Sequence, residues 1–263
     1  MIRQLARAIK RRLTRPAVDI DEAALSGLTD EERFPLLVDC AARLMPAYRL
    51  AWYQVDWWVD PEFEKLLERF GEPRSLNAHR KWMVGQLVRL TAALPGDTAE
   101  CGVYKGASSW LIADANRKSD AGRARVHHVF DSFEGLSEPG DNDLPYWSRG
   151  ALACGLDEVR AALAEFGDSV RFYRGWIPSR FAEVEGTVFC FVHIDVDLYQ
   201  PTRDSIAFFY ERLTPGGVLV CDDYGFATCP GATRACDELL ATKREKMIRL
   251  PDGGGFFIKG TKS

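Results

Sequence analysis

The pattern of hydrophobic and polar positions changes near residue 95 of this 263-residue chain. Between Asp19 and about Leu94, apolar residues recur at helical spacing, and prolines with capping residues divide the stretch into several predicted helices. One of these covers 61–70, and the last one ends near Leu94. After the turn at 95–97, short apolar runs bounded by turn residues predict strands, with helical segments between them.

The second part of the chain alternates strands and helices. The predicted strands cover 99–103, 125–130, 170–173, 187–192 and 218–221, and a hairpin pairs 247–250 with 255–259. The predicted helices end near 116 or cover 156–166, 181–184, 202–213 and 230–243, and 215–217 forms a turn. This order is typical of an α/β fold with a doubly wound, mostly parallel sheet that ends in an antiparallel hairpin. We expect a helical extension over 1–75 and the sheet domain over 76–263.

Composition and charge exclude some functions. The chain has 46% hydrophobic and 27% charged residues, as globular proteins do, and its net charge of −4 argues against a nucleic-acid partner. The seven cysteines form no CxxC pair and three of them fall in predicted strands, so we expect reduced thiols, neither disulfides nor zinc, and a cytoplasmic location. No apolar run reaches the roughly 18 residues of a membrane span, and residues 1–15 lack the apolar centre of a signal peptide.

The N-terminal part offers surfaces for partners. Residues 2–13 place apolar side chains on one helical face with basic residues between them. We expect a surface or oligomer-contact helix; the alternative is a helix that lies on an anionic membrane surface. The tyrosines and tryptophans between 48 and 58 are expected to pack against a neighbouring layer, or else to line a substrate cleft.

The first predicted strand runs into a glycine-containing turn, Glu100 to Gly106. Glycines let the backbone approach a ligand closely, and the start of the following helix offers free N–H groups. The turn spells neither the GxGxxG of nicotinamide sites nor the GxxxxGK[ST] of a P-loop. Asp131 closes the next strand, where a carboxylate can accept from both hydroxyls of a ribose. These features indicate an adenosyl ligand without a pyrophosphate; the alternative is that both acids have only local roles.

Two neighbouring strands end in pairs of carboxylates, Asp195 with Asp197 and Asp222 with Asp223. Four carboxylates at one edge of a sheet are costly to bring together without a cation, and all-oxygen ligands select Mg²⁺, or Mn²⁺ or Ca²⁺, over zinc. Three could hold the ion while the fourth acts as a base toward a hydroxyl. The alternative is that these acids cap helices and are solvated in loops.

The spacing of these acids sets conditions on such a site. Asp195 and Asp197 face one side if the strand continues to Asp197, and the contiguous pair reaches one ion only if the backbone turns sharply. His193 lies two residues before Asp195, so both side chains would face the same side of the strand. It could orient the substrate or the base, or it could be a core histidine.

Together these motifs resemble the macrocin O-methyltransferase family, whose members methylate sugar hydroxyls. The resemblance runs from about Arg80 to Leu240 and rests on four stretches, namely 99–106, 131–136, 193–199 and 222–225 with Pro230-Gly231. It implies a class I methyltransferase fold (Rossmann-like), S-adenosyl-L-methionine and Mg²⁺ as cofactors, and a small-molecule or glycan acceptor. Rival interpretations are an O-methyltransferase of catechols or phenols and a non-catalytic adenosyl-binding scaffold. A homo-oligomer and peripheral membrane contact through the basic helix are further expectations.

The resemblance also assigns roles to residues. The metal would be held by Asp195, Asp222 and Asp223, with Asp197 as general base and His193 beside it. The residues implied to bind the cofactor are Glu100, Gly102, Tyr104, Gly106, Ser108, Asp131, Ser132, Gly175, Trp176 and Asp195. The loop 137–149 matches a region that covers the acceptor, where Tyr146 and Trp147 could stack on a sugar face.

Overall fold

The computed structural model describes residues 22–47, 60–72, 77–119 and 125–260. It divides the chain into two compact units, Met1–Trp58 and Val59–Ser263. The sequence suggests a division after residue 75, whereas the helix α4 (Pro61–Arg69) belongs to the second unit. The helix predicted at 2–13 and the aromatic cluster between 48 and 58 lie outside the described residues.

The described part of the first unit holds two helices, α2 (Glu22–Leu25) and α3 (Asp30–Leu44). Helix α3 begins at a capping box, in which Thr29 and Glu32 each accept a hydrogen bond from the other's backbone N–H. Several apolar side chains of α3, among them Leu36 and Leu37, are exposed to solvent.

Three helical segments precede the sheet in the second unit. Asp60 caps α4 by accepting hydrogen bonds from the next turn, and Pro61 at the first helical position has no N–H to leave unsatisfied. Helix α5 (Ala78–Leu87) follows and continues as the 3₁₀ helix η2 (Val88–Thr91). These segments confirm the helices predicted at 61–70 and before Leu94.

The sheet has seven strands in the order β3-β2-β1-β4-β5-β7-β6. Its strands are β1 (Asp97–Cys101), β2 (His127–Asp131), β3 (Val170–Arg174), β4 (Phe189–Ile194), β5 (Leu213–Cys221), β6 (Ile248–Arg249) and β7 (Gly255–Ile258). The pairs among β1 to β5 are parallel, and β7 pairs antiparallel with both β5 and β6. The predicted α/β class and the C-terminal antiparallel hairpin are therefore confirmed.

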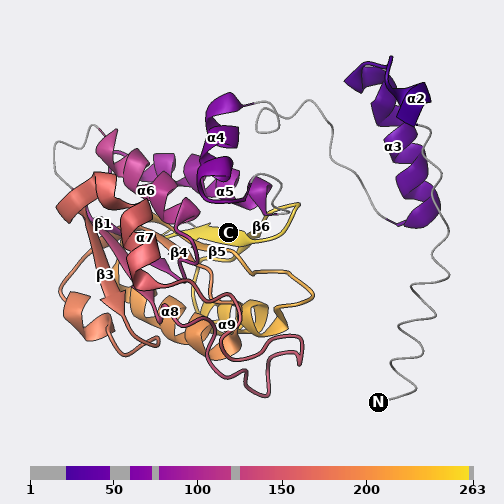
Figure 1. Cartoon of the computed structure of the whole chain (residues 1–263). Helices are drawn as coiled ribbons and strands as arrows, with labels where there is room; N and C mark the ends of the chain where they lie inside the picture. The colour runs from indigo at the N-terminus through magenta and orange to yellow at the C-terminus, as the bar shows by residue number, and fades with distance from the viewer. Residues whose placement is uncertain (1–21, 48–59, 73–76, 120–124, 261–263) are drawn as a thin grey trace. The chain divides into compact units, whose positions relative to one another are not determined.

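Helices cover both faces of the sheet (Figure 1). Helices α5, α6 (Ala107–Arg117) and α7 (Leu156–Ala162) pack on one face, and α8 (Tyr199–Arg212) and α9 (Pro230–Leu240) pack on the other. The 3₁₀ helices η3 (Ala164–Ser169) and η4 (Phe181–Val184) flank β3 and β4. Every residue of β4 is buried, as the apolar run before Asp195 predicts for a strand covered on both faces.

One predicted turn is wrong. Residues 215–217 lie within β5, because the backbone of Gly216 and Gly217 exchanges hydrogen bonds of 2.8 Å with Lys259. The strand therefore begins at Leu213, five residues earlier than the apolar run beginning at Val218 indicates.

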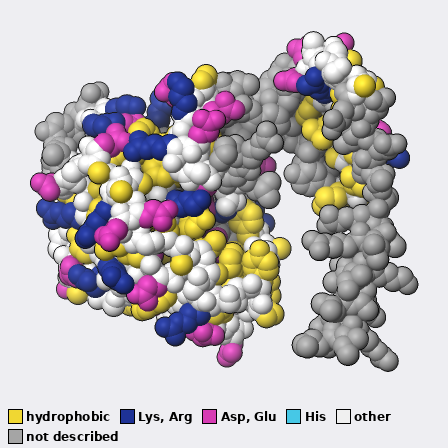
Figure 2. Space-filling model, in the orientation of Figure 1, with side chains coloured by type: hydrophobic (Ala, Val, Ile, Leu, Met, Phe, Trp, Pro, Cys, Tyr) yellow, Lys and Arg dark blue, Asp and Glu magenta, His cyan; other side chains and the backbone are white. Residues whose placement is uncertain are grey.

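The surface of the second unit carries charges of both signs, and Lys and Arg lie among Asp and Glu on the face that Figure 2 shows. Among the described residues, no helix has the length and apolar character that a membrane span requires.

The chain order creates a switch point between β1 and β4. Strands β2 and β3 lie on one side of β1, and the chain then crosses to β4 and β5 on its other side. In doubly wound sheets, ligands bind at such a point, beyond the carboxyl ends of the strands. The carboxyl ends of β1, β4 and β5 are where the acidic and glycine-containing motifs lie.

Candidate active site

Backbone hydrogen bonds align the ends of the central strands. Asp195 N–H donates to Cys101 O at 2.8 Å, and Asp222 N–H donates to Ile194 O at 2.9 Å, so the parallel ladder continues one residue past each strand. A Cβ on Gly102 would overlap the carbonyl oxygen of Asp195, and Gly102 has a φ of +80°. Only glycine fits this close approach without strain, which explains its place in the first motif.

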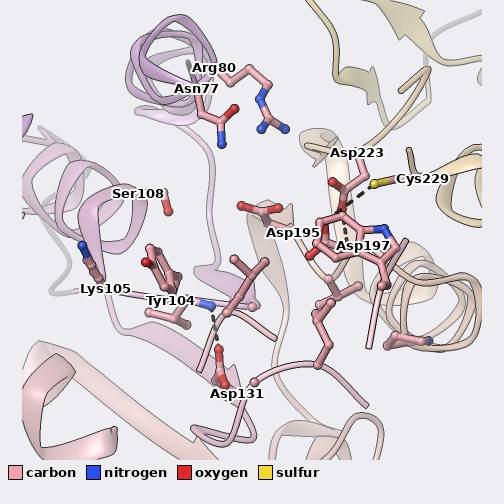
Figure 3. Close-up of a pocket in the computed structure, with 18 of the residues that line it drawn as sticks. Asn77, Arg80, Tyr104, Lys105, Ser108, Asp131, Asp195, Asp197, Asp223 and Cys229 are labelled. Carbon is pink, nitrogen blue, oxygen red and sulfur yellow. Dashed lines mark hydrogen bonds between the residues drawn. The ribbon is translucent and has the colours of Figure 1, made fainter. Parts of the chain in front are cut away.

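A cavity of about 950 Å³ opens over this edge (Figure 3). This volume lies within the roughly 300–1,000 Å³ of small-molecule sites. Nine of the residues predicted to form the site line it, namely Gly102, Tyr104, Ser108, Asp131, Ser132, Trp176, Asp195, Asp197 and Asp223. Five predicted residues are not part of its wall, namely Glu100, Gly106, Gly175, His193 and Asp222.

The end of the cavity next to β1 and β2 is built from backbone amides around Asp131. Its two carboxylate oxygens accept hydrogen bonds from Val103 N–H at 2.8 Å and Phe133 N–H at 2.6 Å. Burial raises the pKa of Asp131, although these amides oppose the shift. Each oxygen keeps a second lone pair, so the carboxylate can still accept from a ligand hydroxyl.

The turn after β1 alternates between ordinary and left-handed backbone. Tyr104 has a φ of +49° and Gly106 a φ of +95°, directly before α6. Ser108 in the first turn of α6 and Asn77 before α5 face the same part of the cavity in Figure 3. The turn therefore presents the N-terminus of α6 to a ligand, as the glycine pattern predicts.

Three predicted cofactor residues lie just after the ends of β2 and β3. Ser132 Oγ donates to Gly135 O at 2.8 Å and accepts from Glu134 N–H at 3.0 Å, so it orders the turn after β2. Gly175 N–H donates to Asp131 O at 2.9 Å, which continues the β2–β3 ladder and brings Trp176 to the cavity wall.

Glu100 and His193 lie beneath the cavity, within the sheet. The register pairs them on β1 and β4, and His193 Nδ1 lies 2.7 Å from Glu100 Oε1. Ser109 Oγ donates to the other oxygen of Glu100, and His127 lies 3.8 Å from it. Burial alone would raise the pKa of Glu100, but the hydrogen bonds with His127 and His193 outweigh it and lower the pKa to about 2. Glu100 therefore holds His193 from beneath the cavity and is not itself part of the cavity wall.

His193 bridges two carboxylates. Its Nε2 lies 3.6 Å from Asp222 Oδ1, on the side opposite Glu100. Burial would lower the pKa of His193, but its hydrogen bonds with Asp222 and Glu100 raise the pKa to about 10. With its two ring nitrogens directed at Glu100 and Asp222, His193 is placed to order these acids.

The four aspartates form two groups. One group, His193 with Asp195 and Asp222, has ligand atoms within 4.8 Å of one another, and the same holds for Asp197 with Asp223 and Cys229. The strand ends at Ile194, so the sequence condition that it continues to Asp197 is not met. Asp197 has a φ of +58° instead, and its N–H donates to Asp223 Oδ2 at 2.8 Å. The contiguous pair also diverges, since Asp222 faces His193 while Asp223 faces Asp197.

Burial is the largest cause of the raised pKa values of Asp195, Asp197 and Asp223. It raises the pKa of Asp195 to about 8, helped by the charge of Asp222, and it raises the pKa of Asp197 to about 6. The pKa of Asp223 is also raised, by burial and then by the charges of Asp197 and Asp195. The pKa of Asp222 is lowered, because His193 and Arg80 together outweigh its burial.

Arg80 is a site residue that the sequence analysis missed. Its guanidinium donates to the side chain of Asp222 and, at 3.0 Å, to the Asp222 carbonyl, and it lies 4.6 Å from the ring of Phe226. It extends from α5 toward Asp195 in Figure 3. No periodic pattern marks an arginine for such a contact across 142 residues.

The acidic edge fits a divalent cation. Burial and the charges of neighbouring aspartates raise the pKa of Asp195 and Asp223, so a cation that replaces their protons would relieve this repulsion, and their oxygens are the donors that hard cations prefer. Asp195 and Asp223 both line the cavity, where substrate oxygens could complete the coordination.

Aromatic side chains line the part of the cavity under the loop 137–149. Tyr146 and Trp147 meet edge to face with ring centroids 4.8 Å apart, and both line the cavity. Trp147 Nε1 donates to Thr228 O at 3.1 Å. This bond holds the Trp147 ring at the end of the cavity that contains the aspartates. A rigid aromatic wall of this kind suits the flat face of a sugar or another ring.

Known structures share the fold of the second unit. CalS11, a calicheamicin methyltransferase, superposes with a TM-score of 0.65 at 18% identity, over 94% of this chain and 100% of that one. The O-methyltransferase NovP superposes with a TM-score of 0.60 at 24% identity, over 75% of this chain and 88% of that one. At these identities the likeness concerns the fold alone.

Sequence comparison identifies the family. A tetracenomycin-C 4'-O-methyltransferase of Streptomyces olivaceus, named for its 2,3-dimethoxy-rhamnosyl substrate, is 34% identical over 153 residues, 54% of this chain and 58% of that protein. Mycinamicin III 3''-O-methyltransferase of Micromonospora griseorubida is 30% identical over 152 residues, 53% of this chain and 59% of that protein. The chain thus spans less than two thirds of the length of these relatives. The model of the family described as Macrocin-O-methyltransferase (TylF) matches residues 83–251, well over half of the chain, so this chain belongs to the macrocin O-methyltransferase family.

Proposed function

We propose that this protein is an S-adenosylmethionine- and Mg²⁺-dependent O-methyltransferase that acts on a hydroxyl of a sugar or glycoside. One observation carries the proposal: a single cavity joins the turn after β1 and Asp131 to the buried carboxylates after β4 and β5. A donor at one end and an acceptor hydroxyl at the other would meet over Asp195. The relatives named as methyltransferases of glycosylated natural products support the acceptor class.

The donor would occupy the end of the cavity formed by β1 and β2. S-adenosylmethionine supplies an electrophilic methyl group on a cationic sulfonium. Asp131 would accept from its ribose hydroxyls, Trp176 would lie near its adenine, and the turn at Gly102 and Tyr104 with Ser108 would hold its methionine end. The carboxylates at the far end of the cavity attract a positive donor, which favours the orientation with the sulfonium toward them.

Asp197 would take the proton of the acceptor. In the balanced step the acceptor oxygen forms a C–O bond with the methyl carbon as the C–S bond breaks, and the hydroxyl proton passes to the Asp197 carboxylate. The products are the methyl ether and S-adenosylhomocysteine. Asp197 lines the cavity, and burial raises its pKa to about 6, close to the range in which a base is effective.

The metal would be held by Asp195, Asp222 and Asp223, as the family resemblance implies. Because Asp222 and Asp223 lie in two neighbouring groups, one of these side chains would have to turn toward the other group to share an ion. A bound Mg²⁺ would supply positive charge that stabilises a deprotonated hydroxyl. Asp195 and Asp223 already face the cavity, while His193 and Arg80 hold Asp222 in place at its base. Glu100 would support this set through His193.

The test is a methyl-transfer assay with glycosides and catechols as acceptors. We expect S-adenosylhomocysteine and a methyl ether with a glycoside in Mg²⁺, and loss of both in EDTA. Transfer to catechols alone would favour a phenol-directed enzyme, and binding of the donor without release of S-adenosylhomocysteine from any acceptor would favour a scaffold.

The N-terminal part would assemble or position the enzyme. We propose that residues 1–75 form a helical extension that mediates homo-oligomerisation or covers the substrate, and that the basic segment 2–13 contacts an anionic membrane if the acceptor is lipid-linked. Light scattering and vesicle co-sedimentation of the full chain and of a variant without residues 1–15 test these two roles.

A further inference from the structure

The loop between β2 and α7 is closed at its base. Leu136 N–H donates to Ala151 O at 2.8 Å, and Gly150 N–H donates back to Leu136 O at 2.9 Å. Gly135 has a φ of +87°, and a Cβ there would press on the backbone of Gly150 and Ala151. The loop 137–149 is therefore held with its two ends together, and its tip is presented to the rest of the site.

Three side chains of the tip attach it to the far side of the cavity. Asn142 accepts from Arg234 of α9 at 2.7 Å, and Trp147 donates to the backbone of Thr228 at 3.1 Å. The third is Asp143, whose Oδ1 accepts from Tyr199 N–H at 2.8 Å.

The Asp143 contact completes the start of α8. The N-cap of this helix is Leu198, whose side chain cannot accept a hydrogen bond from the first turn. Asp143 supplies the missing acceptor from 56 residues away, and its negative charge is favourable at a helix N-terminus. The helix thus depends on the loop for its cap.

Asp197 lies directly before this capped end. Its own backbone N–H is held by Asp223, and two residues later the N–H of Tyr199 is held by Asp143. Asp197 takes a φ of +58° between these two anchors, a conformation that costs free energy for a residue with a Cβ. Two carboxylates from different parts of the chain therefore hold the backbone on both sides of the Asp197 side chain, whose Oδ1 accepts from Cys229 Sγ at 3.7 Å.

We propose that Asp143 is a positioning residue: seating of the loop 137–149 on α8 sets the geometry of Asp197, so that proton transfer requires a docked loop. The inference rests on the proposed function of Asp197 as base. Since Tyr146 and Trp147 line the cavity from the same loop, acceptors that contact these rings keep the loop seated and are methylated faster.

Gly231 makes room for this contact. It is buried in the first turn of α9, and a Cβ there would overlap Asp143 Oδ1 and lie 3.0 Å from Tyr199 N. The Pro230-Gly231 pair that forms part of the family resemblance therefore leaves space for the Asp143 carboxylate. Replacing Gly231 displaces that carboxylate without removing it, and it also presses on Tyr199 Cβ, 2.8 Å from the added Cβ.

The experiment compares five variants of the full chain with glycoside acceptor and Mg²⁺. Asp143→Ala removes the cap, Asp143→Asn keeps an oxygen acceptor, and Gly231→Ala displaces the carboxylate. Asn142→Ala removes the hydrogen bond between the same loop and Arg234. Asp141→Ala is the control, at an exposed neighbouring residue. The readouts are kcat, KM for each substrate, and the affinity for S-adenosylmethionine by calorimetry.

We expect Asp143→Ala and Gly231→Ala to lower kcat by about 10- to 100-fold, the range that a hydrogen bond to a charged group provides. Affinity for the donor stays within about twofold and Asp143→Asn restores most of the kcat. Asn142→Ala lowers kcat less than Asp143→Ala does, because it loosens the same loop and leaves the cap of α8 in place. Asp143→Ala with wild-type kcat overturns the inference, and so does an equal loss of kcat in Asp141→Ala. If Asp143→Ala does not fold, unchanged kcat in Gly231→Ala overturns it. Wild-type protein that transfers no methyl group would instead refute the proposed function.

Discussion

Replacing His193 with glutamine should destabilise the protein strongly, because this imidazolium holds two buried carboxylates apart. Its Nδ1 lies 2.7 Å from Glu100 and its Nε2 lies 3.6 Å from Asp222, and all three side chains are at most 9% exposed. Removing one partner of a buried ion pair costs about 3–5 kcal/mol, since it leaves an uncompensated charge. We therefore expect His193→Gln to lower the free energy of unfolding by about that amount at pH 7.

The effect should depend on pH with a defined sign. The pKa of His193 is raised to about 10 in the folded protein, against about 6.5 when unfolded. The folded protein therefore binds the proton more tightly, and the stabilisation is complete below about pH 6.5 and declines as the pH rises toward 10. The difference between wild type and His193→Gln should shrink over that interval.

Urea denaturation at pH 7, 8.5 and 9.5 measures the difference. His79→Gln is the control at a half-buried histidine whose Nε2 lies 3.0 Å from the backbone oxygen of Asp252, and we expect a loss below about 1 kcal/mol. A loss below about 1 kcal/mol for His193→Gln, or a difference that grows with pH, would refute the ion-pair account.

Three further predictions concern the site. Asp197→Asn should lower kcat by about 10²- to 10⁴-fold while calorimetry shows unchanged donor affinity; a wild-type rate would exclude this residue as base. Gly102→Ala should cost more than about 2 kcal/mol in urea denaturation because of its φ and its overlap with Asp195, whereas Gly186→Ala, with open space around it, should be nearly neutral. Burial raises the pKa of Asp195 to about 8, so the metal-free protein is stabilised less by this carboxyl as the pH rises through 8. Below that pH, protons compete with a cation for the same oxygens. Mg²⁺ should then raise the Tm more at pH 8.5 than at pH 6.5; an equal rise at both would contradict this.

The fold was predictable because its signals are local. Each strand of the parallel part shows an apolar run or a turn signal, and β4 is buried along its whole length as its composition indicates. The order of strands and helices then restricts the topology. The extra length of β5 was not predictable, since its pairing of Gly216 and Gly217 with Lys259 depends on the hairpin 40 residues later.

The site was predictable mainly where its residues lie at or just after the ends of strands. Gly102, Asp131 and Asp195 follow β1, β2 and β4 and meet at one edge of the sheet. The roles of Glu100 and His193 depend on the strand register, which places them side by side under the cavity. Arg80 and Asp143 reach the acidic edge and α8 from a helix and a loop remote in sequence, so no local pattern could mark them.

We propose that one cavity brings a methyl donor and an acceptor hydroxyl together over carboxylates that hold a metal ion. Methyl-labelled S-adenosylmethionine, incubated with the protein and a panel of glycosides, tests it by mass spectrometry of the products. We expect a labelled methyl ether in Mg²⁺, its loss in EDTA, and its return when Mg²⁺ is added in excess. Full-rate transfer in EDTA, or no labelled ether from any glycoside, would contradict it.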